Sequence, residues 1–131
     1  MKDPSVAMRP TAGHVVSTKY SLKDLVQNIN MNGDYKDWAI LCRTNSAVES
    51  IMDGLEENNI PCVTFKQGDL NKSKLEKIMT SNTVKVLTAH SAKGLEWNNV
   101  ATYKLWWGSP EERRLNYVAA TRARNLLIMY K

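Results

Sequence analysis

The stretch Trp38-Ala39-Ile40-Leu41-Cys42 is a continuous apolar run with a charged residue on either side. An unbroken run of this length is typical of a strand that is buried on both faces of a parallel sheet. Other short runs rich in β-branched or apolar residues predict further strands, at His14–Thr18, Cys62–Phe65, Val84–Thr88, Val100–Leu105 and Leu126–Met129.

Helical patterns alternate with these strands. Ser21 precedes apolar residues at helical spacing that end at Gly33, and Thr44 or Asn45 precedes a second such stripe. Ser73 begins a capping-box pattern, and Pro110 follows a serine at the start of a fourth helix. The alternation predicts an α/β domain in three layers, with a mainly parallel sheet and helices on both faces. Ligands of such domains bind at the carboxyl ends of the strands.

Length and composition bound the class of protein. The chain has 131 residues, 43% of them hydrophobic and 24% charged, as in one ordinary globular domain. Its apolar runs are too short to span a membrane, and no secretory signal is recognisable. The spacing of Cys42 and Cys62 favours neither a disulfide nor a metal site, so we expect a cytoplasmic protein. Residues 1–13 show no apolar period and are predicted to be a flexible tail or linker.

The charge is uneven along the chain. The net charge is 18 − 13 = +5, but residues 1–65 carry 6 − 8 = −2 and residues 66–131 carry 12 − 5 = +7. A basic half favours a polyanionic partner such as nucleic acid or nucleotide. A solvated lysine-rich face explains the same count, and charge alone leaves both interpretations open.

Two segments in the basic half carry chemically informative residues. In the first, VKVLTAHSAKGLEWNNV (84–100), a strand leads into a loop where Thr88, His90 and Lys93 can donate to phosphates and Gly94 permits a close turn. In the second, EERRLNYVAATRARNLL (111–127), Arg122 lies at the end of a helix, where a guanidinium can bind a phosphate. The purely structural alternatives are a polar turn for the first segment and an exposed ion pair for the arginine of the second.

No complete hydrolytic site accompanies these segments. The sequence has no GxxxxGK[ST] phosphate loop, no GxGxxG turn, no acidic pair placed to hold magnesium, and no nucleophile–histidine pattern. We therefore expect no metal site in this chain.

The two segments together resemble the UvrD/Rep/PcrA family of superfamily 1 helicases. TAHSAKGLEW is similar to that family's motif V and EERRLNYVAATRA to its motif VI, while WAILCRTNSAVESIMDGLEENNIP resembles the conserved stretch after motif IV. The resemblance implies the second RecA-like motor domain of an ATP-dependent DNA helicase. That domain closes over ATP and Mg²⁺ bound by the N-terminal RecA-like domain of the same parent chain, and it grips single-stranded DNA.

The resemblance also implies roles for single residues. Arg122 matches the arginine that reaches the γ-phosphate, Glu96 the glutamate near the ribose, and Gly94 the glycine of the same nucleotide loop. The residues that match nucleic-acid contacts are Arg43, Thr44, Asn45, Thr88, His90 and Lys93, of which Lys93 is alternatively a brace for the loop. The family favours 3′ to 5′ movement. The isolated domain lacks both Walker motifs and is expected to be inactive.

Departures from the family refine the expectation. About 17 residues link Phe65 to Thr83, where the family usually inserts a large helical subdomain, so residues 14–131 are predicted to form a minimal second domain. Trp97 is assigned to core packing rather than to base stacking. Trp106 and Trp107 form either a docking surface for the first domain or ordinary packing. The alternative function is a non-catalytic module, derived from a helicase, that binds single-stranded nucleic acid or docks onto a partner.

Overall fold

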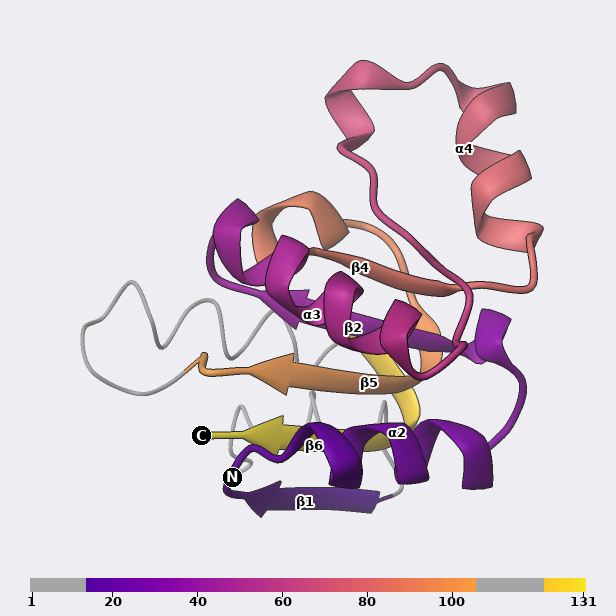
Figure 1. The fold of residues 1–131 in the computed structure, drawn as a ribbon. Coiled ribbons are helices and arrows are strands. Elements are labelled where there is room, and N and C mark those ends of the chain that lie inside the picture. Colours follow the sequence, from indigo (N-terminus) through magenta and orange to yellow (C-terminus); the bar gives the residue numbers. More distant parts are fainter. Residues whose placement is uncertain (1–13, 106–121) are drawn as a thin grey trace, which may run out of the picture.

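The computed structural model describes residues 14–105 and 122–131 (Figure 1). Its helices and strands are β1 (His14–Thr18), α2 (Leu22–Met31), β2 (Trp38–Cys42), α3 (Asn45–Glu57), β3 (Cys62–Val63), α4 (Lys72–Thr80), β4 (Val84–Thr88), β5 (Trp97–Tyr103) and β6 (Ala123–Tyr130). Short 3₁₀ turns lie at Tyr35–Asp37, Gln67–Asp69 and Ala89–Ala92.

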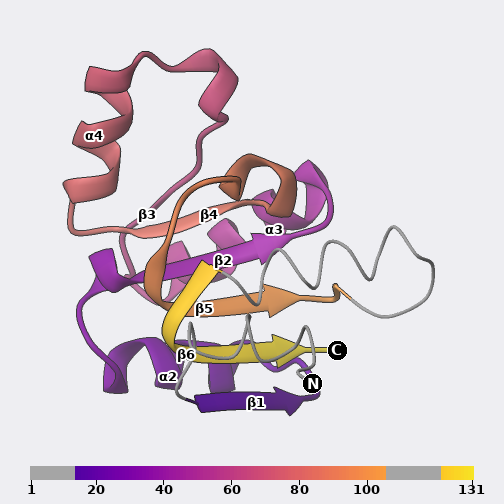
Figure 2. The ribbon, with the colours of Figure 1, turned by 180° about the vertical axis from the view of Figure 1, so that it is seen from behind.

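The six strands form one sheet in the order β1-β6-β5-β2-β4-β3, and every neighbouring pair is parallel. The arrowheads of β1, β5 and β6 accordingly point in one common direction within each view, Figure 1 and Figure 2. The predicted strand Trp38–Cys42 is β2, which lies between β5 and β4 and is buried at every position. The α/β prediction is confirmed, and the sheet is fully parallel rather than mainly so.

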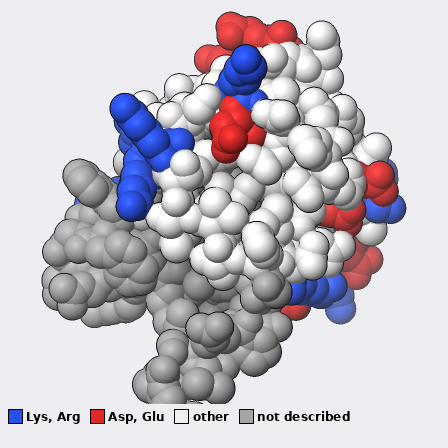
Figure 3. Space-filling view, turned by 90° about the horizontal axis from the view of Figure 1, so that it is seen from below, with Lys and Arg blue, Asp and Glu red and all other residues white. Residues whose placement is uncertain are grey.

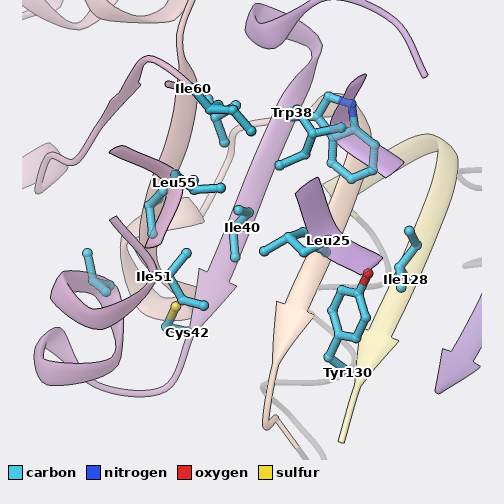
Figure 4. Packing of buried hydrophobic residues seen from close by; sticks show 14 of the residues in the cluster. Leu25, Trp38, Ile40, Cys42, Ile51, Leu55, Ile60, Ile128 and Tyr130 are labelled. Carbon is cyan, nitrogen blue, oxygen red and sulfur yellow. The ribbon is translucent and has the colours of Figure 1, made fainter. Parts of the chain in front are cut away.

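Helices α2 and α3 cover one face of the sheet (Figures 1 and 2). Figure 4 shows Leu25 of α2 between Ile40 of β2 and Ile128 of β6. Ile51 and Leu55 of α3 belong to the same core and lie beyond Ile40, on the side of Ile40 away from Leu25. On the opposite face, Leu41 and Leu87 belong to a second core. Three side chains of α4 pack against it: Leu75, Ile78 and Met79.

The starts of the helices follow from their capping residues. Ser21 Oγ accepts from Asp24 N, and Thr44 rather than Asn45 caps α3 by accepting from Ala47 N at 3.1 Å. The prediction that Ser73 begins a helix is wrong by two residues. Asn71 caps α4 by accepting from Lys74 N at 2.8 Å, because asparagine is an equally good cap two residues earlier.

Three of the predicted strands differ from the structure in their bounds. β3 ends at Val63, β5 begins at Trp97 instead of Val100, and β6 begins at Ala123 instead of Leu126. The register pairs Trp97 with Ala123 but Asn99 with Leu126, so β6 carries one extra residue there. This bulge leaves Arg124 and Asn125 both exposed and hides the strand pattern in the sequence.

Several predictions fall outside the described residues: the tail 1–13, the helix that begins at Pro110, and Trp106 with Trp107. Within the described ranges, no helix has the length and apolarity needed to cross a bilayer.

Candidate functional site

The parallel sheet has two edges with different chemistry. We call the first three residues after each strand the carboxyl edge, and the three residues before each strand the amino edge. Among the described residues, the carboxyl edge contains no Asp or Glu; its basic residues and histidine are Lys19, Arg43, Lys66, His90, Lys104 and Lys131. The described part of the amino edge carries both signs: Lys36, Asp37, Glu96 and Arg122.

The space-filling view agrees with this difference. In Figure 3, a group of Lys and Arg side chains lies on the left, the side toward which the strands of Figure 1 point. Acidic and basic side chains are mixed on the right of the same view. This asymmetry between the two ends of the strands differs from the one between the halves of the sequence, because Lys19 and Arg43 of the carboxyl edge belong to residues 1–65.

The carboxyl edge brings most of the predicted nucleic-acid residues together. Arg43, Thr44 and Asn45 follow β2, while Thr88 ends β4 and His90 follows it. β2 and β4 are neighbours, and their register pairs Cys42 with Thr88. The two predicted groups therefore begin on adjacent strands at the same level, and Arg43, Asn45 and His90 are exposed there.

Two of these residues already hold local structure. Thr44 caps α3, and Thr88 Oγ1 accepts from Ser91 N at 3.4 Å and donates to Ser91 Oγ at 3.1 Å. Thr88 thereby caps the 3₁₀ turn Ala89–Ala92. A phosphate needs a donor, and Thr88 has committed its single O–H donor to Ser91, whereas Thr44 only accepts in its cap and keeps its O–H donor for a phosphate.

Gln67 holds the loop after β4, and sequence reasoning missed it. Its amide Nε2 donates to the carbonyl oxygens of Ser91 and Lys93, each at 2.7 Å. Lys93 itself is exposed at the end of the 3₁₀ turn. The brace of this loop is therefore Gln67 acting on the backbone, and no local pattern could have paired residues 24 and 26 positions apart.

Gly94 carries the chain from this loop toward the amino edge. Its φ is +80°, a backbone conformation that residues other than glycine rarely adopt. No described atom lies within 4 Å of an added Cβ. Within the described part of the chain, glycine is needed at this position for backbone conformation and not for space.

At the amino edge, Arg122 lies next to the loop that precedes β5. β5 and β6 are neighbours with Trp97 opposite Ala123, which puts the residues before them side by side. Arg122 Nη1 donates to the carbonyl oxygen of Leu95 at 3.4 Å, while its Nε is buried with no hydrogen-bond partner among residues 14–105 and 122–131. The predicted nucleotide residues Gly94, Glu96 and Arg122 therefore gather at this edge, away from the predicted nucleic-acid residues.

Glu96 forms an ion pair that the sequence did not predict. Its Oε1 accepts from Arg124 Nε at 3.0 Å, and both side chains are about half exposed. The bulge in β6 exposes Arg124 at this level. Exposed pairs of this kind contribute little to stability, so Glu96 can exchange this partner for another donor.

A polar hollow of about 540 Å³ lies beside this ion pair. Its lining includes Asp37, Asn98 and Asn99, which are largely committed to structure: Asn98 donates to Asp37 and Asn99 donates to the carbonyl of Asn32. The hollow offers few free polar groups. Within the described residues, no group of three or more His, Cys, Asp or Glu side chains is placed to hold a metal.

One buried charge supports the amino edge from inside. Lys85 of β4 is fully buried, and its Nζ donates to the carbonyl oxygens of Ser81 and Thr83 at 2.7 and 2.8 Å. Burial lowers the pKa of this ammonium to about 8. Lys85 therefore fixes the turn before β4 at an energetic cost.

Comparisons of sequence identify relatives of the chain. A family model described as the UvrD-like helicase C-terminal domain matches residues 11–72 and 66–131. A protein of Mycoplasma pneumoniae (strain ATCC 29342 / M129) named "Probable DNA helicase" is 32% identical in an alignment of 124 residues that covers 84% of this chain. The chain spans about a fifth of the length of that relative, 20%.

Solved structures share the fold. The C-terminal domain of a possible DNA helicase from Lactobacillus plantarum WCFS1 has a TM-score of 0.67 at 20% identity, over 92% of this chain and 73% of that one. The C-terminal part of the Fun30 ATPase domain has a TM-score of 0.56 at 13% identity, over 82% of this chain and 39% of that one. The DEAD-box protein SrmB of E. coli, solved bound to RraA, has a TM-score of 0.52 at 15% identity, over 88% of this chain and 75% of that one.

These findings confirm the resemblance drawn from the two sequence segments and the RecA-like fold that it implies. Because the family model matches almost the whole length, the chain belongs to the UvrD-like helicase C-terminal domain family.

Proposed function

We propose that this chain is the C-terminal motor domain of an ATP-dependent DNA helicase, which completes the ATP site and grips single-stranded DNA. The observation that carries the proposal is the separation of the two candidate groups. The residues that match the nucleic-acid contacts begin at the carboxyl edge, those that match the nucleotide contacts lie at the amino edge, and residues 89–96 connect the two.

On the nucleotide side, Arg122 is the residue that would contact the γ-phosphate. Its half-buried side chain with an unpartnered Nε fits a group that completes its hydrogen bonds only when a phosphate arrives. Bound ATP with Mg²⁺ supplies the phosphoanhydride bond that is hydrolysed. The carboxylates that would hold Mg²⁺ are expected on the N-terminal RecA-like domain of the parent chain.

On the nucleic-acid side, Arg43, Asn45, His90 and Lys93 would contact the phosphates and bases of a single strand, with Thr44 and Thr88 close by. The exposed donors and the lack of Asp or Glu at the described carboxyl edge support a polyanionic ligand. Phosphate contacts of this kind hold a strand without reading its sequence.

The connecting segment gives the proposal its mechanism. Residues 89–96 are held by Gln67 near one end, and the carbonyl of Leu95 accepts from Arg122 near the other. A shift of Arg122 on closure of the two motor domains would therefore act on the same segment that presents His90 and Lys93 to the strand. Repeated closure and opening would move the protein along single-stranded DNA. The domain alone is expected to hydrolyse no ATP.

The test is the ATPase activity of the full-length parent, stimulated by single-stranded DNA. Arg122→Ala should lower the rate by ~10³–10⁵-fold, as for other arginine fingers, with nucleotide binding retained. Arg124→Ala is the matched control, because it removes a neighbouring arginine whose partner is an exposed glutamate; its rate should stay within about tenfold. An unchanged rate for Arg122→Ala would reduce the proposal to the non-catalytic nucleic-acid module.

A further inference from the structure

Three lysines form a row at the carboxyl edge that no helicase motif includes. Lys104 follows β5, Lys131 follows β6 and Lys19 follows β1, and these strands are adjacent in the sheet. All three side chains are exposed. The row begins next to Arg43, since β5 is also the neighbour of β2.

Backbone hydrogen bonds fix the row. The parallel ladder continues one residue past the strand ends: Lys104 N donates to Tyr130 O at 2.8 Å, and Lys131 N donates to Thr18 O at 2.9 Å. Successive lysines are therefore about one strand spacing apart, ~4.8 Å at the backbone. From β4 to β1 the carboxyl edge measures four such steps, roughly 19 Å.

Tyrosines support the row from below. The ring of Tyr20 contacts those of Tyr103 and Tyr130 edge to face, with centroids 4.7 and 5.6 Å apart. Lys104 Nζ lies 5.3 Å from the centre of the Tyr103 ring. The lysines therefore stand on rigid backbone and packed aromatic rings, and less ordering is needed when a ligand binds.

The charge of the row is not neutralised within the described structure. None of the three lysines forms an ion pair with a carboxylate of residues 14–105 or 122–131. Lys104 also has a φ of +54°, a conformation in which glycine or asparagine is less strained. A lysine in this conformation is costly for stability alone, which points to a use for its charge.

We propose that the row binds the phosphates of single-stranded DNA, so that the strand continues from Arg43 and His90 across β5 and β6 to Lys19 on β1. This inference rests on the proposed function, and it adds a second group of contacts. Each lysine acts as a point charge that displaces a counterion, without reading bases. The occupant is a nucleic-acid strand because three lysines on successive adjacent strands, with no Asp or Glu at the described carboxyl edge, suit a chain of successive phosphates.

The experiment measures binding of the 131-residue chain to a fluorescent oligothymidylate over a range of salt concentrations. The double variant Lys19→Gln, Lys104→Asn removes two charges, and asparagine suits the backbone at position 104. Binding at low salt should weaken roughly tenfold or more, and the slope of log K against log salt should fall by about 1.4, since each contact to a single strand contributes about 0.7.

Two further variants make the result specific. Lys36→Gln, Lys77→Gln removes the same charge from the exposed side chain of Lys36 at the amino edge and that of Lys77 in the last turn of α4, and its slope should equal that of the wild type. Arg43→Gln tests the contacts of the proposed function. If Arg43→Gln weakens oligothymidylate binding while the lysine double variant binds as the wild type does, the row is overturned and the proposed function stays intact. A wild type that does not bind the oligonucleotide would overturn both the row and the proposed grip on DNA.

Discussion

The two edges of one parallel sheet show how a single domain can serve two ligands. The strands enter at an edge of mixed charge, where Arg122 and Glu96 lie with their own neighbours Leu95 and Arg124. They leave at an edge whose described residues include no acid, where the donors face solvent. Under the proposed function, this difference matches a long polyanion at the second edge and a compact ligand, shared with another domain, at the first.

Substitutions at Trp97 test most directly whether the two edges have separate ligands. It begins β5 at the amino edge and is 4% exposed, so it cannot stack on a base held at the other edge without unfolding the strand. Trp97→Ala should cost about 3–5 kcal/mol of unfolding free energy, measured in urea. Trp97→Phe should cost less than about 1.5 kcal/mol, because it keeps most of the volume and removes an indole N–H that has no hydrogen-bond partner among the described residues.

The binding of single-stranded DNA by Trp97→Phe provides the control. Since Trp97 lies at the amino edge and the proposed DNA contacts lie at the carboxyl edge, the folded variant should bind single-stranded DNA as the wild type does. A folded Trp97→Phe that no longer binds would mean that the two edges share their ligand.

Lys85, which holds the turn before β4 at the amino edge, should make the free energy of unfolding depend on pH. Its pKa is about 8 in the folded chain and near 10.5 when unfolded, so between these values the unfolded state holds more protons. This group therefore opposes folding below pH 8 and ceases to do so as pH rises toward 10.5. Relative to Lys85→Met, the wild type should gain at most about 1.4 kcal/mol per pH unit in this window.

The difference between the two urea-unfolding curves isolates Lys85, because other groups, including Cys42, titrate in both proteins. Parallel curves for wild type and Lys85→Met would mean that the lysine remains charged at an ordinary pKa inside the fold.

The sequence predicts the central strands well and the site contacts poorly. β2 has the predicted bounds because its continuous apolar run marks a strand buried on both faces, and β4 has them because β-branched and apolar residues surround Lys85. β6 begins earlier than predicted because its bulge exposes two consecutive polar residues. The contacts of Gln67 with the loop after β4, and of Glu96 with Arg124, join residues more than 20 positions apart. Such pairs follow from the order of the strands, which no local pattern contains.

Gly94 tests whether the two edges communicate. Gly94→Ala keeps the surroundings open but forces alanine into a φ of +80°, which should cost about 1–2 kcal/mol. Gly68→Ala is the matched control, since its surroundings are also open and its φ is not positive; its stability should change by less than about 1 kcal/mol. Urea unfolding measures both.

In the full-length parent, Gly94→Ala should also weaken the stimulation of ATPase activity by single-stranded DNA, while the rate without DNA changes less. Residues 89–96 are the link between the edges, so a change in their conformation affects communication before it affects either ligand alone. Equal loss with and without DNA would place Gly94 in the nucleotide site only.

A change at Gln67 should have an effect that is confined to the carboxyl edge. Gln67→Met keeps the length of the side chain and removes both donors to the loop after β4, which should cost about 1–2 kcal/mol. Hydrogen exchange of the amides of residues 89–94 should quicken and oligothymidylate binding should weaken a few-fold, because the loop that carries His90 and Lys93 loses its brace. Gln27→Met, an exposed change on α2, should alter neither. If the exchange of residues 89–94 quickens while binding stays the same, the loop after β4 contributes no contacts to the strand, and the grip at this edge rests on Arg43 and its basic neighbours alone.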